Sequence, residues 1–179
     1  SAHNKERGDE VNIQEILLLT ISGTAVLMDF LWERVSNALI LLSLTSGFVF
    51  WTLSHGSAGI LYFLPGFLLP IFCFLPLFHF RMIGGGDVKL LSVLGGILGY
   101  PKVLGLLLFS FLTGGILSIA FLISTGSLKE RISYFFNYFY EYSKTGIEKN
   151  YRKKGMEAEN FHFTVPIFTG IILFIGGYY

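Results

Sequence analysis

Two aspartates are the residues of this sequence with the clearest capacity for chemistry. The chain has three aspartates, of which Asp9 lies in a charged N-terminal stretch, whereas Asp29 and Asp87 lie in otherwise apolar segments. A carboxylate in or near hydrocarbon is costly unless it faces water or a partner. Two carboxylates that approach each other tend to share one proton, so one can deprotonate a water molecule while the other protonates a carbonyl oxygen. The residues predict such a catalytic pair, which needs no metal or cofactor.

The sequence also allows a simpler, structural interpretation of each aspartate. An isolated buried aspartate near a helix end often caps that helix or pairs with a nearby cation. Arg34 and Lys89 are close enough in sequence to serve as those cations.

A glycine triplet directly precedes the second aspartate, in the stretch "MIGGGDVKLL". Gly84, Gly85 and Gly86 give the backbone access to φ > 0 and allow another chain to approach closely. Asp87 would then lie at the N-terminus of a new helix, whose positive dipole end favours an anion. We therefore expect an extended segment of a second molecule to lie beside a carboxylate held in a fixed place.

The composition predicts that a lipid bilayer surrounds these residues. Hydrophobic residues make up 53% of the 179 residues and charged residues only 14%, which is too little polar surface for a soluble domain of this size. The net charge of +1 gives no electrostatic reason to expect a nucleic-acid partner.

About six segments are long enough, or nearly so, to cross the bilayer, which takes roughly 20 helical residues. They are residues 11–32, 37–54, 59–80, 87–100, 102–124 and 161–179, and the fourth is too short to cross alone. We therefore predict an all-α, polytopic membrane helical bundle that forms one domain over residues 1–179. Residues 1–10 are expected to be a flexible tail or a non-native remnant.

The distribution of basic residues predicts the orientation of the bundle. Most of them lie between the last two spans, which marks that loop as cytoplasmic: Lys129, Arg131, Lys144, Lys149, Arg152, Lys153 and Lys154. Six spans then place Asp29 and Asp87 at the same cytoplasmic end. A pair is therefore geometrically feasible.

The loop of residues 125–160 contains an aromatic run, "RISYFFNYFYEY", preceded by Ser127 and Glu130 at the spacing of a capping box. We interpret it as an interfacial helix with aromatic rings at headgroup depth and basic residues toward anionic lipid. A substrate-docking role is the alternative.

The single cysteine and the histidines do not predict a metal site. Cys73 is alone, and His3, His55, His79 and His162 have no metal-ligand spacing. His79 and His162 lie near the cytoplasmic ends of their spans, where they could approach the aspartates.

At this point the sequence resembles the type IV prepilin and preflagellin peptidases, which are membrane aspartic proteases of the GxGD type. "GGGDVKLL" is similar to the second aspartate motif of that family, which carries a lysine two places after the aspartate. "DFLWERVSNALI" is similar to the first motif, with Arg34 and Asn37 in place, but Val35 stands for an isoleucine and Ser36 for a proline. "FTVPIFTG" is similar to the final segment of the family.

The resemblance implies an intramembrane aspartic endopeptidase with Asp29 and Asp87 as its catalytic residues. The implied substrates are pilin-like precursors, which lose a short basic leader at the cytoplasmic face of the cell membrane. The chain lacks the cysteine-bearing domain of larger relatives, so the resemblance is to the short form, without N-methyltransferase activity.

Three neighbouring residues receive supporting roles on this reading. Lys89 points to a different helix face from Asp87 and either meets an acidic group of the substrate or extends to the membrane interface. Arg34 is expected to be structural, and Asn37 to hydrogen-bond a neighbouring span.

Two other classes of function stay open on the sequence. A small proton-coupled transporter or channel also combines paired acids with broken helices. A non-catalytic assembly subunit is the third.

Overall fold

The computed structural model describes residues 2–79, 83–124, 126, 128–145 and 162–178. Every regular element in this part of the chain is helical, which confirms the predicted all-α class. In chain order the elements are α1 (Ala2–Trp32), α2 (Asn37–His55), the short 3-10 helix η1 (Gly56–Ala58), α3 (Gly59–His79), α4 (Gly85–Leu98), α5 (Val103–Ser124), α6 (Leu128–Thr145) and α7 (Thr164–Ile175).

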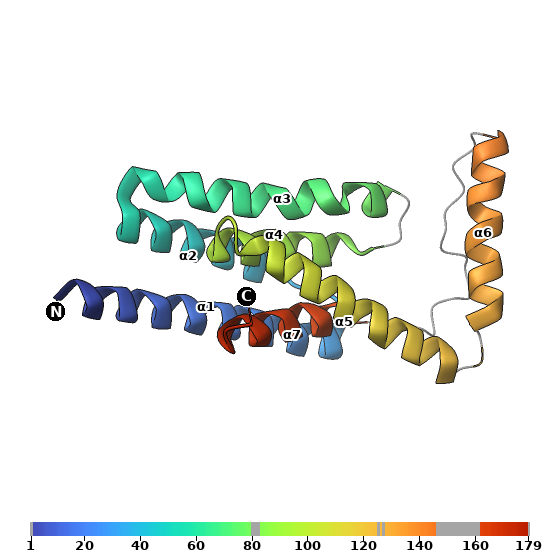
Figure 1. Ribbon diagram of the computed structural model, residues 1–179, viewed down its shortest axis with the longest axis horizontal. Coiled ribbons are helices and arrows are strands. Elements are labelled where there is room, and N and C mark those ends of the chain that lie inside the picture. The colour runs from blue at the N-terminus through green and yellow to red at the C-terminus, as the bar shows by residue number, and fades with distance from the viewer. Residues whose placement is uncertain (1, 80–82, 125, 127, 146–161, 179) are drawn as a thin grey trace.

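Six of these helices run back and forth along the longest axis of the molecule (Figure 1). Their directions alternate in the order α1, α2, α3, α4, α5 and α7. This alternation brings the C-terminal end of α1 and the N-terminal ends of α4 and α7 to the same end of the bundle (Figure 1). Helix α6 lies beyond that end and crosses the direction of the other helices (Figure 1).

Three stretches of the described chain are long and apolar enough to cross a membrane: Ile13–Trp32, Asn37–His79 and Val103–Ser124. The second contains α2 and α3, which have 19 and 21 residues. Helices α4 and α7 have 14 and 12 residues. At about 1.5 Å per residue they fall short of a hydrocarbon core of about 30 Å. The bundle therefore combines long spans with two short helices.

The last helix is shorter than the sequence predicted. The apolar run of residues 161–179 suggested a full span, whereas α7 covers Thr164–Ile175. Two consecutive glycines follow Ile175, and Gly177 adopts a φ of 76° in the left-handed region. Glycine adopts this conformation at little cost, so the pair ends the helix.

Helix α4 forms the centre of the bundle. All nine residues from Leu90 to Leu98 are buried, and α1, α2, α3 and α5 pack around them. The closest approach is to α3, where a Cβ added to Gly95 would lie 2.5 Å from the carbonyl oxygen of Gly66. The two backbones therefore touch, because neither glycine carries a side chain.

The C-terminal end of α4 lies inside the bundle, where its last carbonyl groups have no intrahelical donor. Gln14 of α1 donates from Nε2 to the carbonyl oxygen of Ile97 at 2.6 Å. Trp51 of α2 donates from Nε1 to the carbonyl oxygens of Gly96 and Ile97 at 3.0 and 3.1 Å. Irregular backbone is tolerated at membrane depth when its polar groups are satisfied within the protein. These two side chains therefore allow α4 to be shorter than a full span.

Replacing Gln14 with leucine is expected to destabilise the bundle by about 1–3 kcal/mol, because it leaves buried carbonyl groups with fewer donors. Thermal unfolding in detergent measures the loss. The matched control is Thr24→Val on the same helix, because Thr24 is exposed and its Oγ1 donates only to Thr20 of its own helix. Equal thermal stability of the two variants would contradict the proposed contribution of Gln14.

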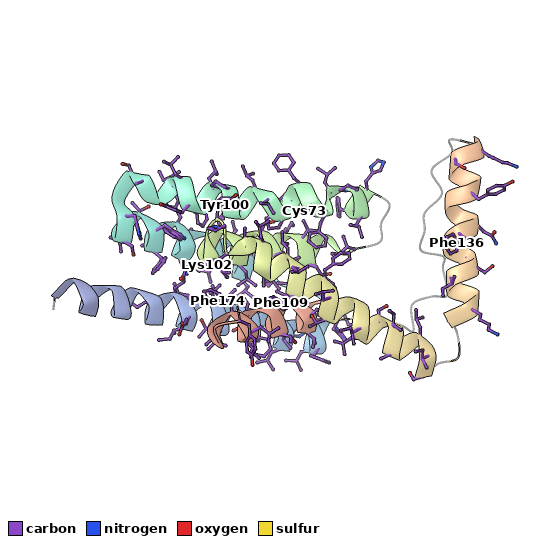
Figure 2. All side chains as sticks on the ribbon, viewed as in Figure 1. Cys73, Tyr100, Lys102, Phe109, Phe136 and Phe174 are labelled. Atoms are coloured by element: carbon purple, nitrogen blue, oxygen red, sulfur yellow. The ribbon has the colours of Figure 1, made fainter. Side chains whose placement is uncertain are left out.

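Small residues bring α5 and α7 together. A Cβ added to Gly170 of α7 would lie 2.9 Å from Oγ of Ser110. A Cβ added to Gly114 of α5 would lie 2.8 Å from the ring of Phe163. At the other end of α7, the ammonium of Lys102 lies 5.1 Å from the centre of the Phe174 ring (Figure 2). These contacts fix α7, and with it Thr164, against the bundle.

Two segments outside the bundle core can be compared with the structure that the sequence suggested for them. Helix α1 begins at Ala2, so the backbone of residues 2–10 is helical where the sequence suggested a tail. A helix, α6, is present in the predicted aromatic segment, and it exposes Ile132, Phe136 and Tyr140, which are four residues apart. Phe136 is labelled in Figure 2. Ser127 of the predicted capping box lies outside the described residues.

Candidate active site

Asp29 lies in the last turn of α1, three residues before the helix ends at Trp32. Its carbonyl oxygen accepts a hydrogen bond from the backbone N–H of Glu33, which adopts a positive φ of 53°. The side chain is 14% exposed. The carboxylate is therefore held at the end of a helix, largely enclosed by the protein but within reach of solvent.

Two side chains from the start of α7 contact the same oxygen of Asp29. Thr164, the first residue of the helix, donates from Oγ1 to Oδ2 of Asp29 at 2.7 Å. Nδ1 of His162 lies 3.0 Å from that same Oδ2. The imidazole also packs against Phe30, with ring centres 4.6 Å apart. Helix α7 therefore supplies the polar environment of the first aspartate.

Asp87 is the third residue of α4, and Gly84 is the N-cap of that helix. The Asp87 carboxylate accepts a hydrogen bond from the backbone N–H of Gly84. This is the reciprocal half of a capping box, in which the third helical residue reaches back to the N-cap. The simpler interpretation of Asp87 as a helix cap is thus correct as far as it goes. It does not exclude a second role, because a carboxylate has two oxygens.

The structure places the two aspartates and His162 at the same end of the bundle, within electrostatic reach of one another. The charges of Asp29 and of His162 both act on the carboxylate of Asp87. Asp29 is 58 positions before Asp87 and His162 is 75 positions after it. The convergence therefore results from the alternating path of the helices and not from any local pattern.

The glycine triplet has a different structural role from the one predicted. The sequence suggested φ > 0, yet Gly84 has an ordinary φ of −72°, and Gly85 and Gly86 are helical. What the site requires is the absence of a side chain. A Cβ on Gly84 would lie 2.9 Å from Oδ2 of Asp87, and one on Gly85 would lie 3.2 Å from the ring of Phe78. Around Gly86 there is more space, since the nearest atom is Cβ of Val35 at 4.0 Å.

Lys89 contacts α2 and not either aspartate. Its Nζ donates to Oδ1 of Asn37 at 3.2 Å. This is the contact with a neighbouring helix that was expected of Asn37. Asn37 is the first residue of α2, so it does not lie on the helix that carries Asp29. Among the described residues, the neutral amide of Asn37 is the polar partner of the Lys89 ammonium.

Arg34 does not pair with either aspartate. It lies between α1 and α2 and is exposed, and the described residues offer it no hydrogen bond or ion pair. The alternative in which Arg34 or Lys89 neutralises an aspartate is therefore wrong for the described part of the chain. The partners of Asp29 come instead from α7.

An apolar groove of about 380 Å³ lies between α2, α3 and α4. Its wall on α4 includes Gly85, Val88, Lys89 and Ser92, which recur every three or four residues and so occupy one face of that helix. Asp87 points to another face. The groove thus begins beside the glycine triplet and extends along the bundle from the end that carries the aspartates.

The remaining candidates Cys73, His55 and His79 lie on α2 and α3 and not on the helices that carry the aspartates. Cys73 is exposed on α3 (Figure 2). His55 is at the opposite end of the bundle, where its ring lies 5.1 Å from that of Trp51. His79 is exposed at the C-terminal end of α3. Within the described ranges, no group of three or more His, Cys, Asp and Glu side chains could hold a metal ion.

Thr164 is the residue that sequence reasoning missed. A threonine in an apolar helix usually bonds to its own backbone, so its type gave no signal. Its position in the chain did carry a signal, because Thr164 starts the last helix at the same end of the bundle as both aspartates. His162 was noted for this reason.

The family model described as the type IV leader peptidase family matches residues 16–119, more than half of the chain. The matched range contains Asp29, the glycine triplet and Asp87, whereas His162 and Thr164 lie beyond it. No curated protein and no solved structure matches the chain significantly.

Proposed function

We propose that this chain, which belongs to the type IV leader peptidase family, is an aspartic endopeptidase that removes the short basic leader from pilin-like precursors. Membership of the family makes the chain a peptidase. The observation that supports the aspartic type is that Asp29 and Asp87 lie at one end of the bundle, where the charge of Asp29 acts on Asp87.

The proposed mechanism uses the two carboxylates as one unit. Two carboxylates that approach each other tend to hold one shared proton, because ionising both would place like charges side by side. The ionised member takes a proton from a water molecule, which then attacks the carbonyl carbon of the scissile peptide. The protonated member donates to the carbonyl oxygen, and the tetrahedral intermediate collapses as the amine leaves with a proton. No cofactor is required for these transfers.

We further propose that cleavage occurs at the cytoplasmic face of the cell membrane. The basic loop between α5 and α7 supports this orientation, because Lys and Arg concentrate on the cytoplasmic side of membrane proteins. Helix α6 supports it too, since it crosses the direction of the bundle at the end that carries the aspartates (Figure 1). Its exposed aromatic face suits a place at the lipid headgroups.

A cleavage assay tests the proposal. The purified protein in detergent is given a pilin precursor, and mass spectrometry follows the loss of the leader and reports any methyl group on the new N-terminus. Cleavage to an unmethylated product is expected. In sealed inverted vesicles, precursor added from outside should also be cut. Absence of cleavage would favour a transporter, a channel or an assembly subunit.

We propose that Lys89 recognises an acidic group on the substrate. Its ammonium stands at the wall of the apolar groove, with a neutral amide as its polar partner among the described residues. An apolar segment with one acidic side chain would match both features.

Replacing Lys89 with methionine is then expected to raise KM about tenfold and leave kcat unchanged, because the lost contact is made equally in the ground and transition states. Lys89→Arg keeps the charge and should stay near the wild-type value. An unchanged KM for Lys89→Met would show that Lys89 only extends to the interface.

A further inference from the structure

We infer that Thr164 is a positioning residue for Asp29, which holds one oxygen of the carboxylate so that the other faces the reacting atoms. This inference rests on the proposed function, because it assigns a role in the reaction of the same site. It concerns a residue outside the range that matches the family model.

The contacts of Asp29 are unequal at its two oxygens. Oδ2 receives the Thr164 hydroxyl at 2.7 Å and lies 3.0 Å from Nδ1 of His162. Oδ1 has no hydrogen-bond partner among the described residues. A carboxylate with both contacts on one oxygen has a fixed plane, and its second oxygen is left available. Water or a substrate carbonyl can therefore approach at Oδ1.

Thr164 is suited to fix that plane because it is itself immobile. The residue is 1% exposed, it starts α7, and its β-branched side chain has few rotamers. Helix α7 is in turn held against α5 through Ser110 and Gly170. His162 is less enclosed, at 23% exposure of its side chain. Thr164 is thus the more rigid of the two contacts.

The position of α7 explains why a hydroxyl is needed there. Asp29 lies on α1, and its charge acts on Asp87 of α4. An aspartate side chain that turned about its own bonds would lose the geometry required for proton transfer, which is sensitive to a displacement of about 1 Å. A single short hydrogen bond from a third helix restricts this rotation without adding a charge to the pair.

Two variants of Thr164 separate positioning from packing. Thr164→Val keeps the shape and removes the hydroxyl, whereas Thr164→Ser keeps the hydroxyl and removes a methyl group. We expect Thr164→Val to lower kcat about 10- to 100-fold, the range for loss of one hydrogen bond to a charged group, with KM unchanged. Thr164→Ser should retain kcat within about threefold, because an intact hydrogen bond leaves only a packing loss.

The control is Thr169→Val on the same helix. Thr169 is a half-buried threonine, and its Oγ1 donates to the carbonyl oxygen of Val165 in its own helix. Its kcat should equal that of the wild type. A purely structural role of Thr164 predicts the opposite order, with Val tolerated and Ser impaired. That order, or wild-type kcat in Thr164→Val, overturns the inference.

A double-mutant cycle on thermal unfolding keeps the inference testable apart from the peptidase activity. Thr164→Val, Asp29→Ala and the double variant are compared in detergent. The melting temperature should fall less on Thr164→Val when Asp29 is already alanine, since the acceptor is then gone. Strict additivity overturns the inference even if cleavage is observed. If the wild-type chain cleaves no precursor, the proposed function fails, whereas coupling between the two substitutions still decides whether the Thr164 hydroxyl holds the Asp29 carboxylate.

Discussion

Replacing Asp87 or Asp29 with asparagine is expected to lower kcat for leader cleavage by about 10³- to 10⁴-fold, the upper range for loss of a general acid or base. Asparagine keeps the size and the hydrogen-bond acceptor of aspartate but cannot exchange a proton at the pH of the assay. The fold should therefore persist in both variants while the chemistry is lost.

The double variant distinguishes a catalytic pair from two independent residues. Because the carboxylates act as one unit in the proposed mechanism, Asp29→Asn with Asp87→Asn should be no slower than either single variant. The matched control is Glu33→Gln, which removes an exposed carboxylate four residues after Asp29. Its kcat should stay close to that of the wild type. Independent, multiplying losses in the double variant would argue against a shared proton.

The second large effect concerns stability, at the contact of α3 with α4. Gly95→Ala is expected to lower the free energy of unfolding by about 1–3 kcal/mol, the usual cost of overpacking. The added Cβ would lie 2.5 Å from the carbonyl oxygen of Gly66 and 2.7 Å from Cγ2 of Val103. Neither neighbour can withdraw easily, because one is backbone and the other is a fully buried side chain.

Gly115→Ala on α5 is the control for this stability effect. A Cβ at Gly115 meets nothing within 4 Å, so the change should stabilise the helix by about 0.5–1 kcal/mol, as alanine does in a helix interior. Thermal unfolding in detergent should therefore show shifts of the melting temperature of opposite sign for two substitutions of the same type. Because α4 carries Asp87, Gly95→Ala should also reduce cleavage. A stability equal to that of Gly115→Ala would mean that α3 and α4 are not in backbone contact.

Much of the architecture is encoded locally and could be predicted from the sequence. Apolar runs and the glycines that interrupt them placed α2, α3 and α5 within about one residue of their observed ends, since helix formation and helix ends depend on near neighbours in the chain. The alternating path followed from the number of spans. Together these features located Asp29 and Asp87 at one end of the bundle.

The sequence was less informative where a local pattern has two meanings. Three glycines could serve either positive φ or close packing, and the structure shows that they begin α4 with ordinary dihedral angles. The final apolar run looked like a full span, but α7 is only 12 residues long. In both cases composition gave the tendency and the surrounding helices determined the outcome.

Only the tertiary structure decided which side chains meet. Thr164 bonds to a residue 135 positions away, and Gln14 satisfies a carbonyl group 83 positions away. Neither contact produces a periodic pattern in the sequence, because each depends on the rotation and depth of two helices that pack against each other. The sequence by itself therefore determined a helical membrane protein with two acids at one end. The packing of α7 against α1 determined how the first of those acids is held, since the direction of a side chain is fixed by the helices that surround it.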